Sequence, residues 1–275
     1  MAIGKCLLTG ATGTFVKSHL TPQAFTAPTT PGGLFITAGE RTRPIRTFTS
    51  WYDKKIVTRK GEDILADLDS YAVNTLRNKK LVWSGWHKED HLDQHLHDMF
   101  SDTHGIRKIT FEDANKIRLF FLSLLWRWGV STLPAAREVK LSIDQLHQLR
   151  DMILTSNAGD PGYFPITLVQ ISTRGETQNM SPILTEKQIY HHQSDTDKSV
   201  PFYRFYFDGL IAHFDMPSDV SGLGDLVLGA GKDLVFPTVA YEASFQSQNL
   251  TYLKQDVEHE FPDTLRKLLK ASTKT

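Results

Sequence analysis

The sequence of 275 residues has a single cysteine, Cys6, which excludes an internal disulfide and a zinc site built from cysteines alone. It has no net charge, because 31 Lys and Arg residues balance 31 Asp and Glu residues, and this excludes a uniformly basic coat. The most apolar run, Leu119–Trp126, is far shorter than the roughly 20 residues that a bilayer requires. Met1–Gly10 does not resemble a secretory leader. We therefore expect a cytoplasmic protein with no membrane partner.

The charges are unevenly distributed along the chain. The first 80 residues contain twelve Lys and Arg residues but only six Asp and Glu residues, so the rest of the chain is acidic by the same margin. A basic N-terminal third is typical of a surface that meets phosphates. An ordinary solvated surface that leans positive explains the same excess equally well.

The spacing of apolar residues predicts helices and strands in one chain. Helical spacing predicts Gly61–Lys79, a segment from an N-cap at Thr110 to Trp128, Ser142–Ser156 with Ser142 as N-cap, and a polar stretch over His87–Phe100. Strands are predicted over Pro165–Ser172, Val200–Phe207 and Leu210–Met216, with an Asp208-Gly209 hairpin turn between the last two. The fold class is therefore α+β. We expect a small hairpin-plus-helix module at residues 1–80, and a body of helices and strands of no assigned family at residues 81–275.

Two segments near the start of the chain carry a family resemblance. The first is Cys6-Leu7-Leu8-Thr9-Gly10 followed by Lys17-Ser18-His19-Leu20-Thr21-Pro22, and the second is Tyr52–Glu62 followed by Asp67–Tyr71. Together they resemble HNH-type (ββα-metal) nuclease domains, in the branch that reads C-x-x-C-G, "KSHIIP" and "YDKNILC-x-x-CE". Leu122–Ser131 is similar to an "LSLLWR" helix of the same group of bacterial hypothetical and defence-associated proteins. The final hundred residues resemble no family that we can name.

The chain departs from this family where the family binds structural zinc. The two C-x-x-C pairs of the family correspond here to Cys6 with Thr9 and to Thr58 with Gly61. Three of the four thiolates are missing, and neither threonine nor glycine replaces a charged sulfur ligand. We therefore expect no structural zinc at these positions.

His19 is the residue on which the chemical hypothesis depends. The resemblance implies that its imidazole is the general base for phosphodiester hydrolysis, assisted by a catalytic Mg²⁺ or Mn²⁺ ion nearby. The candidate carboxylates on the predicted helix are Glu62, Asp63, Asp67 and Asp69. Of these we expect Asp63 and Asp67 to be catalytic, because they lie four residues apart on one helical face. The nucleic-acid contacts are expected at the basic residues Lys17, Arg41, Arg43, Lys54 and Lys60. The competing interpretation is an ordinary hydrogen-bonded histidine beneath a loop.

Other side chains offer weaker functional patterns. His87, His91 and His95 recur at a spacing of four and form a stripe on the predicted helix, although a solvated polar helix explains them better than a metal site does. Trp83 and Trp86 lie in a less apolar segment, as Trp51 does, and are candidates for base stacking. The Leu119–Trp126 helix is instead expected to be deeply buried.

Two functions from different classes remain open. The resemblance implies a nucleic-acid-directed effector that hydrolyses phosphodiester bonds in a prokaryotic phage-defence or toxin–antitoxin setting, with a partner protein from the same operon. The alternative is a non-catalytic component that binds nucleic acid or a protein through an eroded HNH module. The lost cysteines favour the alternative, whereas the intact run from Lys17 to Pro22 favours the enzyme.

Overall fold

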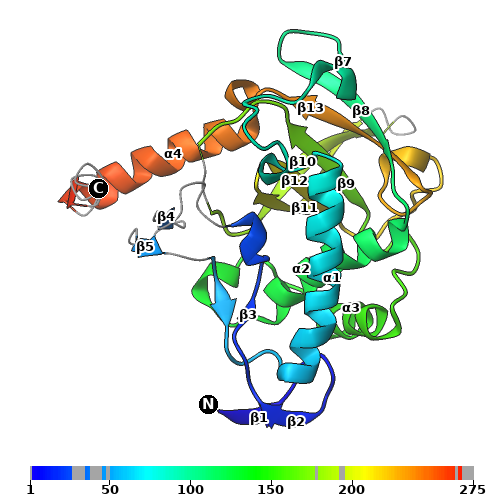
Figure 1. The fold of residues 1–275 in the computed structure, drawn as a ribbon, viewed down its shortest axis with the longest axis vertical. Coiled ribbons are helices and arrows are strands. Elements are labelled where there is room, and N and C mark those ends of the chain that lie inside the picture. Colours follow the sequence, from blue (N-terminus) through cyan, green and yellow to red (C-terminus); the bar gives the residue numbers. More distant parts are fainter. Residues whose placement is uncertain are drawn as a thin grey trace.

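The computed structural model describes residues 2–26, 35–37, 45–47, 50–176, 179–191, 196–263 and 266–267. These residues form both helices and strands, which confirms the α+β class. Within the described ranges, no helix combines the length and the apolar character needed to cross a membrane. The helix Ala114–Val130 (α2) lies against a large sheet, and the helix Arg59–Asn78 (α1) crosses in front of both (Figure 1).

A seven-stranded sheet in the order β10-β11-β12-β9-β13-β8-β7 is the largest element of the body. The strands are β7 (Asp98–Met99), β8 (His104–Thr110), β9 (Ile166–Ile171), β10 (Ile183–His191), β11 (Thr196–Phe207), β12 (Leu210–Asp215) and β13 (Asp233–Val239). Neighbouring strands are antiparallel except for β9 and β13, which are parallel. Asp208 and Gly209, with φ of 51° and 81°, form the predicted hairpin turn between β11 and β12.

Among the described residues, the sheet is accompanied by the α-helices α1 (Arg59–Asn78), α2 (Ala114–Val130), α3 (Ile143–Thr155) and α4 (Phe245–Glu260). The α2 helix contacts both α1 and α3. Every side chain of Leu119–Trp126 is at most 1% exposed, which confirms the predicted burial of this segment. The α4 helix projects away from the body (Figure 1). Short 3₁₀ helices lie at Gln23–Phe25, Trp83–Gly85, Gln94–Leu96, Pro134–Ala136, Gly224–Leu226 and Tyr241–Ala243.

Strand alternation on β11 assigns the two faces of the sheet. Phe205 and Phe207 belong to the main core with α2, whereas Tyr206 belongs to a second cluster with Trp83 and Tyr241. Because successive side chains of a strand point to opposite faces, Phe202 and Arg204 share the face of Tyr206. We call this face, directed away from α2, the outer face of the sheet.

The predicted N-cap is correct for α3 and wrong for α2. Ser142 caps α3 as predicted, and it forms a full capping box with Gln145. Thr110 does not cap α2: it is the last residue of β8, and its hydroxyl donates to Asp233 at 2.6 Å. The N-cap of α2 lies three residues later at Asp113, whose carboxylate accepts from the backbone N–H of Lys116 at 2.8 Å.

The prediction of a polar helix over His87–Phe100 was wrong. This stretch contains only the 3₁₀ turn Gln94–Leu96 and the strand β7, and His87 has φ of 55°. No histidine stripe therefore forms there. Trp83 and Trp86 are 3% and 1% exposed, so neither offers a surface on which a base could stack.

Short strands build the N-terminal part. β1 (Ile3–Lys5) pairs with β2 (Thr12–Thr14), β3 (Ser18–His19) with β6 (Tyr52–Asp53), and β4 (Phe35–Thr37) with β5 (Ile45–Thr47). The main hydrophobic cluster includes α1 side chains such as Leu65 and Leu76 together with α2 side chains such as Phe120. Residues on both sides of position 80 thus share one core.

The outer face of the sheet carries His213, whose protonation we expect to weaken the fold. Burial and the nearby charges of Arg204 and Lys187 lower the pKa of His213 from 6.5 to about 3. Below about pH 6.5, His213 therefore binds a proton in the unfolded chain but not in the folded chain. The free energy of unfolding consequently decreases as the pH falls. Between pH 7.5 and pH 5, His213→Gln should lose about 1–2 kcal/mol less stability than the wild type, as measured by urea unfolding. An equal loss in both proteins would contradict this prediction.

Candidate active site

The four positions that correspond to the zinc cysteines of the HNH family lie together in space. The backbone N–H of Thr9 donates to the Cys6 sulfur at 3.4 Å, and Thr58 also hydrogen-bonds this thiol. A Cβ atom placed on Gly61 would lie only 2.7 Å from Cys6 Sγ, so a glycine permits this close approach. Burial raises the pKa of the Cys6 thiol, but the hydrogen bonds from Thr9 and Thr58 outweigh it and hold the pKa below its usual value.

The short strands β3 and β6 pair with each other, and α1 follows β6 along the chain. Ser18 and His19 of β3 pair with Asp53 and Tyr52 of β6, and α1 starts after the N-cap at Thr58. Backbone hydrogen bonds from Leu7 N to Ile56 O and from Val16 N to Val57 O hold the connection against the N-terminal hairpin. His19 therefore lies on the first strand of a strand–strand–helix unit.

His19 is half-buried and lies beside the ring of Tyr52, which two lysine side chains also approach. Its imidazole meets the Tyr52 ring edge-on, with the ring centroids 6.0 Å apart. Lys17 Nζ lies 4.0 Å from the centroid of the Tyr52 ring and Lys54 Nζ lies 5.6 Å from it. Burial, reinforced by the charge of Lys17, lowers the pKa of His19. The imidazole is therefore neutral at pH 7, which a general base requires.

The other basic residues predicted to bind nucleic acid are placed differently. Lys60 is exposed in the first turn of α1. Arg41 and Arg43 lie outside the described residues. Of the five predicted residues, the structure thus brings Lys17 and Lys54 together at His19.

Asp63 and Asp67, the predicted catalytic carboxylates, lie on the exposed side of α1. Asp63 pairs with Arg59 at 3.9 Å and Asp67 with Lys116 Nζ at 2.8 Å, and both side chains are more than 60% exposed. The reason is helical geometry: α1 buries the face formed by Leu65, Leu68, Ala72 and Leu76, and positions 63 and 67 fall opposite it.

Asp69 is a carboxylate near His19 that belongs to the candidate carboxylates of the helix but was not one of the two that helical spacing selected. Its two oxygens accept from Arg127 at 3.0 and 2.5 Å, and the same guanidinium donates to the backbone carbonyl of His19 at 3.2 Å. The charge of Asp69 partly opposes the lowering of the His19 pKa. Arg127 is only 1% exposed, and a buried arginine in an apolar helix needs an acidic partner. The need of a buried Arg127 for an acidic partner is the feature of the sequence that could have identified Asp69.

Glu62 is a second carboxylate beside β3. Burial raises its pKa, while Ser18 and Arg127 lower it in part. The Ser18 hydroxyl is close enough to Glu62 to lower its pKa, and apart from each other the buried Glu62 Oε2 and Ser18 Oγ have no hydrogen-bond partner among the described residues. Buried oxygens with so few partners are unusual, and they mark a place where a bound water or cation would be stabilised.

The ligand that this site offers is a carboxylate oxygen, a type of ligand that Mg²⁺ and Mn²⁺ accept. Across the ranges that the structure describes, no group of three or more His, Cys, Asp or Glu side chains is arranged as a ready metal cage. Mg²⁺ characteristically keeps several waters and takes one or two carboxylates. Glu62 offers one such carboxylate, whereas Asp69 is already paired with Arg127.

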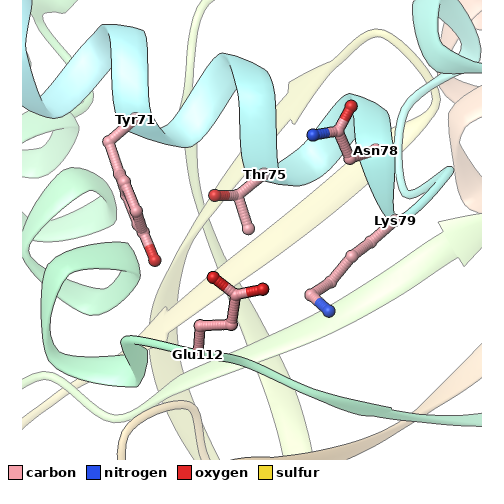
Figure 2. A pocket seen from close by; sticks show the side chains of 5 residues that line it. All are labelled: Tyr71, Thr75, Asn78, Lys79 and Glu112. Carbon is pink, nitrogen blue, oxygen red and sulfur yellow. The ribbon is translucent and has the colours of Figure 1, made fainter.

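A separate pocket of about 190 Å³ lies on the other flank of α1, where Tyr71, Thr75, Asn78 and Lys79 face Glu112 (Figure 2). The carboxylate of Glu112 points toward the helix, between the side chains of Tyr71 and Lys79 (Figure 2). Glu112 is exposed, and the residues that line the pocket do not include His19, Glu62 or Asp69. We therefore place the candidate active site at His19.

Comparisons of the chain with protein-family models, curated proteins and solved structures found no match.

Proposed function

We propose that the protein hydrolyses phosphodiester bonds of a nucleic acid at His19, with Mg²⁺ or Mn²⁺ as cofactor. The observation that carries this proposal is the position of His19 on β3, where its ring meets Tyr52 and where Lys17 and the Asp69 carboxylate of α1 are near enough to affect its pKa. The resemblance of the Lys17–Pro22 run to HNH nucleases supports it. By the same resemblance we propose a prokaryotic defence or toxin–antitoxin setting with an operon-encoded partner protein.

Each side chain has a defined role in this proposal. Lys17 and Lys54 bind the phosphates that flank the scissile bond. His19 accepts a proton from the attacking water, for which its lowered pKa suits it. Glu62 holds the cation through its buried oxygen Oε2. The cation, when bound, stabilises the negative charge that develops on the phosphate.

Glu62→Gln tests the metal-binding role. We expect the variant to need a higher Mg²⁺ or Mn²⁺ concentration for half-maximal plasmid or RNA cleavage. The increase should be at least about tenfold, since even outer-sphere partners of metal ligands cost 10- to 100-fold in affinity. Asp63→Asn is the matched control, because Asp63 is the next residue of α1 and is exposed. A wild type that cleaves neither DNA nor RNA with either ion, or equal metal dependence in both variants, would contradict the proposal.

One observation favours the non-catalytic alternative. Arg127 neutralises Asp69 and fixes the carbonyl of His19, an arrangement that a purely structural cluster would also have. In that case, replacing Lys17 and Lys54 with glutamate would weaken nucleic-acid or partner-protein binding, while no cleavage would be detected in any variant. Loss of cleavage together with binding would instead favour the enzyme.

A further inference from the structure

Buried arginines elsewhere in the molecule have acceptors for their guanidinium groups. Arg107 donates to the carbonyls of Lys79 and Lys80 and to the side chain of Gln170; Arg118 donates to the carbonyls of Ala158, Asp160 and Tyr163; Arg127 donates to Asp69. This pattern is expected, because a buried guanidinium without acceptors is costly.

Arg204 on β11 departs from this pattern. It is 7% exposed, and its Nε is buried without a hydrogen bond, as are the Nε atoms of Arg118 and Arg127; unlike theirs, its terminal NH groups donate to no described residue. Its guanidinium carbon lies 3.8 Å from the centroid of the Phe245 ring, at the start of α4. No carboxylate or other acceptor among the described residues forms a hydrogen bond or an ion pair with it.

The charges around Arg204 leave a net positive patch. His213 lies directly opposite Arg204 on β12, and burial keeps its imidazole neutral by lowering its pKa to about 3. The neighbouring Lys187 is paired with Asp215 at 2.7 Å, which cancels both of those charges. The guanidinium of Arg204 thus remains the unbalanced charge of this part of the outer face.

Aromatic side chains hold these groups in place. Phe202 contacts the His213 ring with the centroids 4.6 Å apart, and Lys187 Nζ lies 5.6 Å from the centroid of the Phe202 ring. The Phe245 ring holds one face of the Arg204 guanidinium and is itself 46% exposed. The donors are thus fixed before any ligand arrives, which lowers the entropy lost on binding.

We propose that Arg204, with the neutral ring of His213 beside it, binds an oxyanion group of a ligand, either a phosphate or a carboxylate. The planar guanidinium presents parallel N–H donors that match two oxygens of either group. A neutral imidazole can add one further donor. The bound anion would supply the charge and the acceptors that the described residues do not provide.

The experiment titrates the full chain with inorganic phosphate, and separately with acetate, at constant pH and ionic strength. The Nε–Hε resonances of the arginines are followed by ¹⁵N NMR, and Arg204→Lys assigns the signal of Arg204. We expect this signal to shift saturably with a Kd of about 1 mM or tighter for at least one of the two anions. The signals of Arg107 and Arg118 are internal controls and should not move. A response to phosphate alone identifies a phosphate ligand, and a response to acetate alone identifies a carboxylate.

Calorimetric titration of Arg204→Lys gives an independent test, because lysine keeps the charge but loses the paired donors. We expect the affinity for the anion to fall by about tenfold or more. Arg266→Lys is the control, since Arg266 is 75% exposed and should show no change. The proposal is overturned if the Arg204 signal does not shift in the wild type, or if the two variants bind the anion equally. If Arg204→Lys does not fold, through-bond assignment of the Arg204 Nε–Hε signal in the wild type keeps the NMR titration decisive.

Discussion

His19→Ala is expected to lower nucleic-acid hydrolysis by about 10²- to 10⁴-fold, the contribution that a positioned general base makes to a reaction. The substitution should leave the protein folded. His19 is only half-buried, and its backbone contacts with Tyr52 and with the Arg127 guanidinium do not depend on the imidazole. Cleavage of plasmid DNA and of RNA is measured in Mg²⁺ and in Mn²⁺, and folding is checked by circular dichroism.

The pH dependence of cleavage sharpens this test. Because burial lowers the pKa of His19, the wild-type rate should fall to half at a pH below that expected for an unperturbed histidine. His147→Ala is the matched control, since His147 is exposed on α3. Unchanged cleavage in a folded His19→Ala protein would remove His19 from the mechanism and leave the binding alternative.

Arg127→Met is expected to reduce the free energy of unfolding by about 3–5 kcal/mol, because it leaves the mostly buried carboxylate of Asp69 without its partner. The guanidinium also joins three elements: it contacts Asp69 on α1, the His19 carbonyl on β3 and Ser123 on its own helix. Urea unfolding at pH 7.5 measures the loss.

Asp67→Asn is the control for this prediction, because the pair of Asp67 with Lys116 has a 71% exposed carboxylate and should contribute less than about 1 kcal/mol. The double variant Arg127→Met with Asp69→Leu should regain part of the lost stability, since it removes both buried charges. If Arg127→Met costs no more than the control, the pair does not hold β3 against α1.

Local signals in the sequence predicted several elements well. Ser142 and Gln145 satisfy each other's backbone N–H groups within one turn, so the start of α3 needs no distant residue. Asp208 and Gly209 tolerate positive φ, and this preference alone is enough to predict the hairpin of β11 and β12.

The errors arose where distant contacts decide the structure. Thr110 looks like a helix cap, but pairing of β8 with β13 extends the strand through it. The histidines of His87–Phe100 fit a helical period. Hydrogen bonds to distant residues set the conformation of this segment instead: Leu92 N donates to Ser172 O, and β7 pairs with β8.

The sequence predicted most of the residues that the strands contribute to the candidate site, but not the carboxylate that α1 contributes. The sequence led to His19, Lys17 and Lys54, and pairing of β3 with β6 adds Tyr52, whose ring both lysines approach. Helical spacing could not choose between the carboxylates of α1, because both sides of the helix carry acids. Burial of Arg127 within α2 decides that Asp69 faces inward, and this packing is a property of the whole core.

The pairing of β8 with β13 has a consequence for the chain during its synthesis. Thr110 and Asp233, which meet at one end of this pair, are 123 residues apart. At translation rates of about 5–20 residues per second, β13 is made roughly 6 to 25 seconds after β8. During this interval the edge of β8 that will receive β13 has no strand to pair with, and such edges attract other chains. The nascent protein is therefore most prone to aggregation before residue 239 leaves the ribosome.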